Sequence, residues 1–377
     1  MTYLRPIVCL ASLSIILGSS LAQAEEPLDW TPKRTWVFVA GLLEWEHPEY
    51  WSPFPAAKKN RRDEQLVKYF SNAGVPQGQI IYLQDSAATK KRIEQEFKKL
   101  LDRTQEGDLL VFYFCGHGYR DRESGQTWFA NYDAASKSNS AWGVPSVFSM
   151  IESHFNGDRV LLLADCCHSG ALYDLALKHK DSDVSYAVIT SSYSHNSSTG
   201  NWTFSDSVLS ALRGDPNVDL NGDKIITLKE MGEYCELELA FVEGQKSMYR
   251  GSTGFPLTTR LATVQRDKKA GEGARVEVEY KQKWYKAKIL ETNGHQSKVH
   301  YTNYDDSWDE WVGPERIRPY APHQFASGDK VQILWSNDKK WYPGTVLKAW
   351  YGLHLIHYEG YDATWDEWVH PGAVRLR

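Results

Sequence analysis

Two short stretches decide the fold of this chain: Asp108-Leu-Leu-Val-Phe-Tyr-Phe114, continuing into Cys115-Gly116-His117-Gly118, and Arg159-Val-Leu-Leu-Leu-Ala164, continuing into Asp165-Cys166-Cys167-His168-Ser169-Gly170. Each stretch begins as an unbroken apolar run, which is typical of a strand buried on both faces of a parallel sheet. Each ends in a polar segment with glycine, which predicts a tight turn at the carboxyl end of the strand. Because ligands of open α/β sheets bind at these ends, the histidine and the cysteines are the first candidates for a functional site.

The same alternation of strand and helix continues on both sides of these stretches. Buried strands are predicted over residues 36–41, 79–83 and 186–190, and helices over residues 58–73, 89–103 and 147–155. Alternating β and α segments with continuous apolar strands predict a mostly parallel sheet with helices on both faces. The predicted fold class of this part of the chain is therefore α/β.

Composition excludes several classes of protein. The chain has 377 residues, enough for two or three domains, and its formal net charge of −5 argues against a chain that coats nucleic acid. A hydrophobic content of 42% with 13% aromatic residues is too high for a disordered chain. Five cysteines in this length exclude a small disulfide-rich scaffold.

The N-terminus predicts a secretory signal peptide over residues 1–24. Arg5 precedes an apolar segment over residues 7–21, and Ala22-Gln23-Ala24 has the small residues of a cleavage site. The alternative, a single membrane anchor, is disfavoured because the apolar run is short and is followed by Glu25-Glu26-Pro27 rather than basic residues. We therefore expect a secreted or periplasmic protein with no membrane segment after cleavage, in which the remaining thiols call for a functional explanation.

The cysteine and histidine motifs predict nucleophilic catalysis by a thiol. A thiol protease needs an imidazole beside the sulfur, to accept the thiol proton and later protonate the leaving amine. It also needs backbone N–H groups nearby to hold the oxyanion. Gly116 and Gly118 allow a tight turn around His117, and Ser169-Gly170 does the same after Cys167.

At this point the residues resemble a known family. Tyr-Phe-Cys-Gly-His-Gly at 113–118 and Asp-Cys-Cys-His-Ser-Gly at 165–170 resemble the two signature blocks of the caspase/metacaspase cysteine peptidases, over a domain spanning residues 34–262. The resemblance implies a caspase-like three-layer α/β sandwich and a cysteine endopeptidase that cleaves a protein or peptide substrate, with no cofactor required for the chemistry. It implies Cys167 as the nucleophile, His117 as the general base, and the N–H groups of Gly118 and Cys167 as the oxyanion hole.

The resemblance also suggests a substrate preference. In metacaspases an acidic pocket binds an Arg or Lys side chain, and Asp165 and Asp63 stand where its two acids are expected. The sequence around Asp63 departs from the family pattern, so an ordinary solvated helix residue is the alternative for this position. We expect cleavage after Arg or Lys, since a desolvated carboxylate attracts these cations strongly.

Residues 219–230 have the spacing of an EF-hand calcium loop. The expected metal ligands are Asp219, Asn221, Asp223, Thr227 and Glu230. Position six, normally glycine, is Lys224, which disfavours the sharp turn that a calcium loop needs at this point. Ca²⁺ is therefore a possible modulator, and the alternative is a solvated turn that caps the helix beginning at Thr227.

The last hundred residues contain a duplication. Gly271–Tyr320 and Gly328–Arg377 repeat at an offset of 57 with no gap, and eight of the 15 tryptophans lie here. Short strand signals separated by turns predict one small β-barrel over residues 274–320 and another over 325–377, after a polar linker at 263–273. The shared pattern Tyr-x-x-x-Trp-Asp-Glu-Trp-Val resembles SH3-like barrels of the Tudor-knot or chromo-barrel family.

Some relatives with this pattern bind methylated lysine in an aromatic cage by cation–π attraction. The candidate ligand-binding residues are Tyr301, Tyr304, Trp308, Trp311, Tyr358, Tyr361, Trp365 and Trp368. The alternative is that these rings fill the core of a very small domain. Residues 271–377 have 14 Lys and Arg against 15 Asp and Glu, so we expect a protein ligand rather than nucleic acid.

Two other functions compete with the peptidase. One is a catalytically silent caspase-like scaffold or binding protein that uses the tandem barrels, and the other is a calcium-dependent adhesion module. The presence of both Cys167 and His117 argues against the first, because a silent domain has no need of the pair. The second leaves the thiol unexplained.

Overall fold

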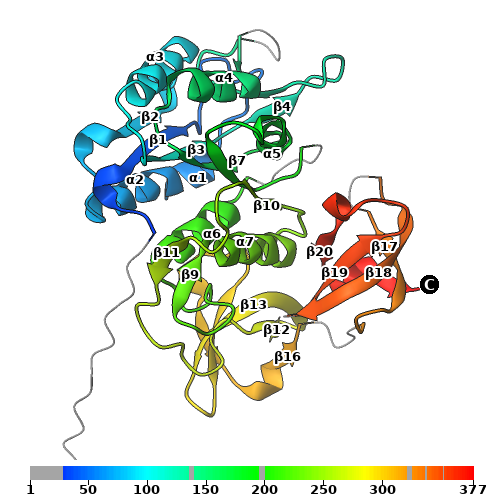
Figure 1. Ribbon diagram of the computed structural model, residues 1–377. Helices are drawn as coiled ribbons and strands as arrows, with labels where there is room; N and C mark the ends of the chain where they lie inside the picture. Colours follow the sequence, from blue (N-terminus) through cyan, green and yellow to red (C-terminus); the bar gives the residue numbers. More distant parts are fainter. Residues whose placement is uncertain (1–28, 136–139, 195–199, 321–324, 336–337, 351) are drawn as a thin grey trace, which may run out of the picture.

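The computed structural model describes residues 29–377, apart from 136–139, 195–199, 321–324, 336–337 and 351 (Figure 1). The predicted signal peptide over residues 1–24 lies outside the described residues. No helix in the described part of the chain is both long enough and apolar enough to cross a membrane.

The first domain is built on a six-stranded sheet in the order β10-β8-β7-β3-β1-β2. All neighbouring strands are parallel except the edge pair β10 and β8. This confirms the predicted α/β class. The strands are β1 (Thr35–Gly41), β2 (Ile80–Gln84), β3 (Leu109–Cys115), β7 (Arg159–Asp165), β8 (Ser185–Thr190) and β10 (Met248–Thr253).

Helices cover both faces of this sheet and make the three layers of the predicted sandwich (Figure 1). One face packs against α3 (Lys90–Leu101), α4 (Val144–His154) and α5 (Ala171–Ala176), and the other against α2 (Arg62–Asn72), α6 (Thr203–Leu212) and α7 (Leu228–Val242). Successive residues of a strand point to opposite faces. Phe112 of β3 therefore packs into the first layer, while Val111 and Tyr113 pack into the second.

The helix predicted over residues 58–73 is wrong at its start. A separate short helix, α1 (Pro55–Lys58), comes first, and α2 begins only at Arg62. Arg61 between them has extended backbone angles, φ −65° and ψ 120°. Its buried side chain, described below, holds the chain in this conformation and prevents a continuous helix.

Two small sheets border the turn that carries His117 and the loop over residues 219–230. The first consists of β4 (Gly118–Arg120), β5 (Thr127–Phe129) and β6 (Trp142–Gly143) in that order. The second pairs β9 (Ile225–Thr227) with β11 (Arg260–Thr263) in antiparallel register. Because β4 begins directly after His117, the first small sheet anchors the turn that carries the histidine.

The C-terminal repeats form two five-stranded antiparallel sheets, as predicted for two small barrels. Both have the same strand order, β15-β14-β13-β12-β16 and β20-β19-β18-β17-β21. In the first barrel the strands are β12 (Arg275–Tyr280), β13 (Lys283–Thr292), β14 (Ser297–Tyr301), β15 (Glu310–Val312) and β16 (Ile317–Pro319). In the second they are β17 (Lys330–Leu334), β18 (Trp341–Trp350), β19 (Leu353–Tyr358), β20 (Glu367–Val369) and β21 (Val374–Leu376).

The prediction that the repeats align without a gap is wrong for their first strand. Val276 lies opposite Ala287 in barrel 1, and Val331 lies opposite Gly344 in barrel 2. The second strands thus differ by 57 positions, but the first strands differ by 55. The hairpin between these strands is longer by two residues in barrel 2, and the ungapped repeat hides this insertion.

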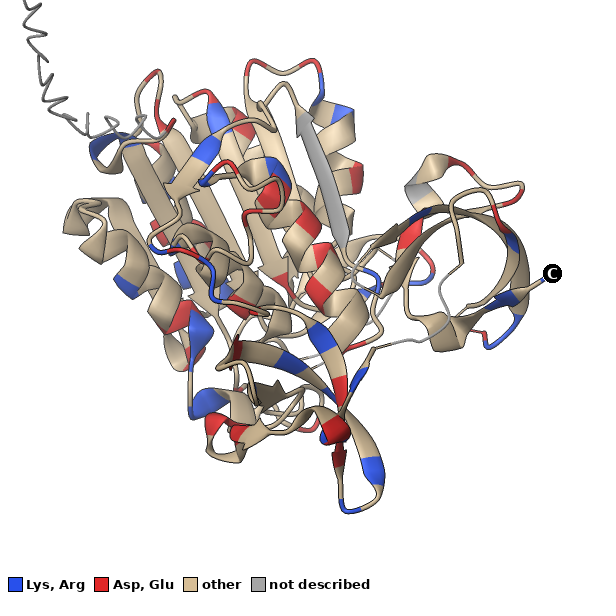
Figure 2. Ribbon diagram, turned by 90° about the horizontal axis from the view of Figure 1, so that it is seen from below, with Lys and Arg blue, Asp and Glu red and all other residues tan. Residues whose placement is uncertain are grey.

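Both barrels pack against α7 of the first domain rather than extending from it (Figure 1). In barrel 1, Arg275 Nη2 lies 2.9 Å from Glu238 Oε1 of α7, and Lys288 pairs with the same carboxylate. In barrel 2, Leu353 joins a buried apolar cluster with Phe241 of α7. The predicted linker is also held in place, since Glu272 is buried and pairs with Arg266. Figure 2 shows Lys and Arg interspersed with Asp and Glu on the visible elements.

Candidate active site and barrel cages

The two motifs meet because of the register of β3 and β7. Cys115 lies opposite Asp165, and the Gly116 N–H donates to the Asp165 carbonyl at 3.3 Å. His117 and Cys167 each follow two residues after this paired position, and both line one small cavity of about 120 Å³. The structure therefore brings the two predicted catalytic residues to one pocket.

Gly118 lies in close contact with the nucleophile segment. A Cβ at this position would be 2.1 Å from the Cys167 carbonyl oxygen and 3.0 Å from Cys166 Sγ, so only glycine fits. The Ala130 N–H donates to the His117 carbonyl at 2.9 Å, which makes Gly118 and Phe129 a non-hydrogen-bonded pair of the β4–β5 ladder. The Gly118 N–H consequently points away from β5, as an oxyanion donor must.

The His117 ring is framed by three aromatic side chains. Its centroid lies 4.6 Å from Trp45, 5.7 Å from Trp51 and 4.6 Å from Phe54. Its Nε2 lies 2.8 Å from the Ser52 carbonyl oxygen. Because a carbonyl only accepts, the proton of the neutral ring resides on Nε2, which leaves Nδ1 as the basic nitrogen.

Exposure distinguishes the four described cysteines. Cys115, Cys166 and Cys235 are buried, and burial raises the pKa of each thiol well above its usual value. Cys167 is the only partly exposed one among the four. Because the thiolate is the reactive form, the three buried thiols are unsuited to attack a substrate.

Asp165 forms a buried acidic wall of the pocket. Its side chain accepts a hydrogen bond from Ser205 Oγ of α6 at 2.6 Å. Burial raises the pKa of Asp165 to about 7, although the hydrogen bonds from Ser205 and Ser191 act in the opposite direction. This carboxyl group is therefore placed to gain from a cationic side chain entering the pocket.

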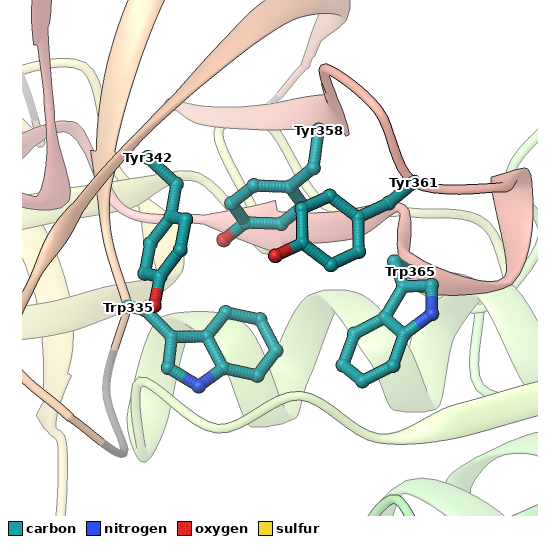
Figure 3. Close-up of a pocket in the computed structure, with 5 residues that line it drawn as sticks. All are labelled: Trp335, Tyr342, Tyr358, Tyr361 and Trp365. Atoms are coloured by element: carbon teal, nitrogen blue, oxygen red, sulfur yellow. The ribbon is translucent and has the colours of Figure 1, made fainter.

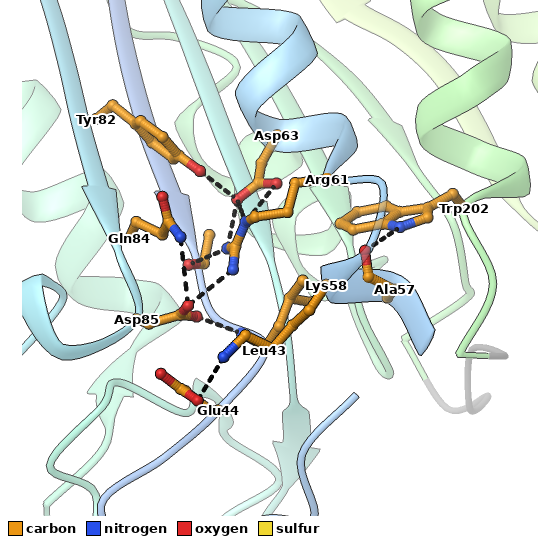
Figure 4. A network of polar contacts seen from close by, with 11 residues as sticks. Leu43, Glu44, Ala57, Lys58, Arg61, Asp63, Tyr82, Gln84, Asp85 and Trp202 are labelled. Carbon is orange, nitrogen blue, oxygen red and sulfur yellow. Dashed lines mark hydrogen bonds and ion pairs between the residues drawn. The ribbon is translucent and has the colours of Figure 1, made fainter. Parts of the chain in front are cut away.

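Asp63 does not line this pocket, and its carboxylate is bound by the Arg61 guanidinium (Figure 4). The Arg61 guanidinium binds Asp63 Oδ2 at 2.7 Å through Nη2 and Asp85 Oδ2 at 2.8 Å through Nη1. The Tyr82 hydroxyl donates to Asp63 Oδ2 at 2.9 Å. Asp63 is fully buried, so the alternative of a solvated helix residue is also wrong.

The rest of this network ties Arg61 to the strand ends. Its Nη2 also donates to the Gly41 carbonyl at 2.8 Å, and Asp85 accepts the Leu43 N–H at 2.8 Å. Asp85 has a positive φ of 45°, and a Cβ on Gly41 would lie 1.8 Å from Asp63 Oδ2. The ion pairs raise the pKa of Arg61 despite the opposing effect of burial. Arg61 is therefore a fixed, charged part of the fold.

A serine-rich segment, residues 191–194, makes hydrogen bonds to the backbone on both sides of Cys167. Ser192 Oγ donates to the Cys166 carbonyl at 2.9 Å, and the Ser169 N–H donates to Ser192 Oγ at 3.2 Å. His168 Nδ1 lies 3.1 Å from the Ser194 carbonyl, and burial lowers the pKa of this histidine. His168 thus stabilises the segment as a neutral ring.

In the calcium-type loop, acidic side chains accept hydrogen bonds from backbone N–H groups of the loop itself. Asp219 accepts hydrogen bonds from the Gly222 N–H at 2.7 Å and the Lys224 N–H at 3.0 Å. Lys224 has a φ of 67°, so the turn that usually requires glycine is made by lysine here. Glu230 and Thr227 form a reciprocal capping box at the start of α7.

The loop acids are not gathered as a set of metal ligands. In the part of the chain that the structure describes, the one group of three acid, histidine or cysteine ligand atoms within 4.8 Å of one another is His300, Asp306 and Asp309. His300 Nδ1 lies 2.8 Å from Asp309, and the equivalent His357 lies 2.7 Å from Asp366 in barrel 2. This pair is a repeated structural contact of the barrels. In the loop over residues 219–230, Glu230 accepts hydrogen bonds at both carboxylate oxygens, from the Leu220 N–H at 3.1 Å and the Thr227 N–H at 3.0 Å.

Each barrel carries a group of five aromatic rings at one end. In barrel 2 the rings surround a cavity of about 220 Å³ and face one another across it (Figure 3). Neighbouring centroids lie 5.5–5.8 Å apart for Trp335 with Tyr358, Trp335 with Trp365 and Tyr361 with Trp365. We call this group the barrel 2 cage; it consists of Trp335, Tyr342, Tyr358, Tyr361 and Trp365. The corresponding rings of barrel 1 are Tyr280, Tyr285, Tyr301, Tyr304 and Trp308.

Three of the four predicted positions belong to these groups and one does not. Trp368 packs against Trp350 at 6.2 Å beside α7, outside the cage lining. Its counterpart Trp311 is 39% exposed in barrel 1. Two further rings of the cage, Tyr342 and Trp335, are not among the predicted positions. Tyr342 lies inside the ungapped repeat and was detectable, whereas the two-residue insertion hides Trp335 from an ungapped alignment.

Comparison with known proteins agrees with this architecture. Residues 77–176 match the family model of the metacaspase, peptidase C14 domain, and residues 273–322 match that of the Agenet domain, which is Tudor-like. The first match includes both His117 and Cys167. The resemblance to a caspase-like peptidase domain followed by Tudor-like repeats is thereby confirmed.

Comparison with individual proteins adds little. No curated protein matches this chain. A crystal structure of a protein from Geobacter sulfurreducens is similar over 62% of this chain and 100% of its own, at 15% identity and a TM-score of 0.42. That likeness is too weak to carry a functional argument.

Proposed function

We propose that this chain is an exported cysteine endopeptidase with Cys167 as nucleophile and His117 as general base. One observation carries the proposal: the register of β3 and β7 puts both residues in one pocket, with Gly118 in contact with Cys167. The metacaspase-type peptidase domain supports a cysteine peptidase acting on protein substrates.

The chemistry follows from the roles of these groups. With its Nε2–H held by the Ser52 carbonyl, His117 takes the thiol proton at Nδ1. The Cys167 sulfur then attacks the substrate carbonyl carbon, and the N–H groups of Gly118 and Cys167 stabilise the oxyanion. The His117 proton passes to the leaving amine as the C–N bond breaks. Water hydrolyses the resulting thioester and regenerates the thiol.

We propose further that the pocket accepts Arg or Lys, with Asp165 as its acid. Because Arg61 already neutralises Asp63, selection for a positive charge depends on Asp165 rather than on a pair of acids. A buried carboxyl group whose ionised form lacks an ion-pair partner gains strongly from an incoming cation.

A peptidase assay of the mature protein tests these assignments. Peptides with Arg, Lys, Asp or Leu before the scissile bond are offered to wild type, Cys167→Ala and the neighbouring control Cys166→Ala. We expect wild type and Cys166→Ala to cleave after Arg and Lys, and Cys167→Ala to be slower by at least about 10³-fold. Activity retained in Cys167→Ala, or a preference for Asp, would reject the proposal.

We also propose that Ca²⁺ binds the loop over residues 219–230 and modulates the enzyme. The spacing of Asp219, Asn221, Asp223, Thr227 and Glu230, and the turn at Lys224, support the proposal. Calorimetric titration with calcium should give heat with wild type and none with Asp219→Ala. Absence of heat with the wild-type protein would end this part of the proposal.

The tandem barrels are proposed to dock a protein or peptide partner. Their Tudor-like character and their aromatic cages support this role. Pull-down of cationic peptides by wild type, compared with Tyr361→Ala and Tyr304→Ala, tests it. Equal capture by all three proteins would show that the cages are not the docking sites.

A further inference from the structure

The two barrels differ in the positive charge that acts on their equivalent glutamates, Glu310 and Glu367. In barrel 1, Arg316 Nη2 lies 2.7 Å from Glu310, within the barrel itself. In barrel 2, Ala373 stands at the position that corresponds to Arg316. The positive charge that acts on Glu367 comes instead from Lys246 of the first domain. Barrel 2 therefore depends on the peptidase domain for a charge that barrel 1 supplies internally.

Lys246 lies against the outer side of the barrel 2 cage. It is buried, and its Nζ lies 4.4 Å from the ring centroid of Tyr193 and 5.9 Å from that of Trp365. The Tyr193 and Trp365 rings are themselves 6.0 Å apart. Trp365 is thus a wall shared by the cage and by a contact with the peptidase domain, whereas neither Lys246 nor Tyr193 lines the cage cavity.

The contact between Lys246, Tyr193 and Trp365 is connected to the backbone beside Cys167, the proposed nucleophile. Tyr193 belongs to the 191–194 segment, whose Ser192 hydroxyl holds the Cys166 carbonyl at 2.9 Å. Gln245, the residue before Lys246, donates its side-chain amide to the Ser191 carbonyl. Two series of contacts therefore connect Trp365 with the backbone beside Cys167. One runs through the Tyr193 ring, and the other runs through Lys246 and the side-chain amide of Gln245.

The chemistry of the cage selects its ligand. Five aromatic faces around about 220 Å³ favour a compact cation, since each ring presents a negative face. Asp338, which accepts the Tyr342 hydroxyl at 2.7 Å, adds a carboxylate near one wall. We propose that a quaternary ammonium group held in the barrel 2 cage changes the reactivity of Cys167 through Trp365, Tyr193 and the 191–194 segment.

The mechanism of coupling is electrostatic and mechanical. Lys246 does not line the cage cavity, but its Nζ lies 5.9 Å from the ring centroid of Trp365, which does, so a cation held in the cage repels the like charge of Lys246. Because Lys246 and Gln245 are neighbours in the sequence, a displacement of Lys246 also moves Gln245 and changes its hydrogen bond with the Ser191 carbonyl. This regulatory role rests on the proposed nucleophile, but it is measurable without any peptidase activity.

The test uses tetramethylammonium as the probe and two readouts on the mature protein. Tryptophan fluorescence reports binding, and the rate of iodoacetamide alkylation at Cys167, mapped by mass spectrometry, reports coupling. The neutral isostere neopentyl alcohol and sodium chloride at equal ionic strength are the controls. Choline and a trimethyllysine peptide then distinguish a free cation from a modified side chain as the source of the group.

We expect saturating tetramethylammonium, but not the controls, to change the alkylation rate by about five-fold or more, the lower end of ordinary coupling between sites. Trp335→Ala should abolish both readouts, while the barrel 1 counterpart Tyr280→Ala keeps the coupling. Lys246→Met with Ala373→Arg, which restores an internal charge to barrel 2, should bind the probe without changing the rate. Failure of the probe to bind, or binding with an unchanged rate in wild type, would overturn the inference.

Discussion

Cys115 and Asp165 face each other at the last paired position of two neighbouring parallel strands. The positions of His117 and Cys167 follow from this register, because each residue lies two positions after the paired ends of β3 and β7. A shift of one residue would turn the side chains of one strand to the other face of the sheet and separate the pair. The pairing of β3 with β7 therefore brings together the two turns that carry the proposed catalytic residues.

The contact between Gly118 and Cys167 predicts a severe effect of the smallest substitution. Gly118→Ala places a methyl group 2.1 Å from the Cys167 carbonyl oxygen, which forces the oxyanion donors apart. We expect kcat to fall by about 10²-fold or more, as on loss of an oxyanion donor. Gly78→Ala is the matched control, since its nearest neighbour would lie at 3.4 Å. Equal activities of the two variants would contradict the assignment.

The raised pKa of Asp165 predicts a pH dependence of substrate choice. Burial raises this pKa to about 7, so the carboxyl group is neutral below that pH and charged above it. The ratio of kcat/KM for an Arg peptide to that for a Leu peptide should increase through pH 7, and titration of the Cys–His pair cancels in this ratio. In Asp165→Asn the ratio should be independent of pH. A flat ratio in wild type would refute the role of this acid.

The same pKa predicts a change in stability. The folded-state pKa lies above the unfolded value near 4, so the folded protein binds the extra proton between about pH 4 and 7. The contribution of Asp165 to stability is therefore lost as pH rises through this window. Urea unfolding should show that Asp165→Asn gains stability relative to wild type at pH 8 compared with pH 5. The opposite trend would show that the carboxylate is stabilised in the fold.

The buried Arg61 network predicts a large loss of stability on removing its cation. Arg61→Met leaves Asp63 and Asp85 buried without a counter-charge, and the free energy of unfolding should fall by about 3–5 kcal/mol. Arg62→Met is the control, because its partner Asp206 is half exposed, and it should cost at most about 1 kcal/mol. Urea unfolding of both variants measures the difference; similar values would contradict the account.

The positive φ of Lys224 predicts a stabilising substitution. Lys224→Gly removes the cost of holding a non-glycine residue at φ 67°, so we expect a gain of about 1 kcal/mol, and tighter calcium binding if the loop takes the ion. Gly222→Ala, where φ is 83° and the added Cβ meets nothing within 4 Å, is the converse test and should lose about as much. Thermal unfolding with and without calcium distinguishes the two effects. No change in either variant would show that the loop is not strained.

Much of the fold was predictable, because it depends on local patterns. The apolar runs of β3 and β7 and the glycine turns after them identify two sheet strands and their functional ends without further information. The ungapped part of the repeat predicts two barrels for the same reason. Their packing on α7 was not predictable, since the pairing of Glu238 with Arg275 and Lys288 joins residues far apart in the sequence.

The candidate site was predictable only where a motif marks it. His117 and Cys167 lie in motifs, whereas Trp45, Trp51 and Phe54, which frame the His117 ring, lie in an irregular loop. The pairing of Asp63 with Arg61, two positions earlier, was not predictable from the sequence. Two adjacent arginines beside an acid give no indication of which one is buried.

Cys167, activated by His117, is the proposed nucleophile of a peptidase. The most direct measurement is mass-spectrometric mapping of the adduct formed by an arginine-containing peptidyl chloromethyl ketone on the mature protein. We predict a single adduct at Cys167, greatly slowed in His117→Ala and unaffected in His168→Ala. An adduct at Cys166 or Cys115, or none on the folded wild-type protein, would contradict the account.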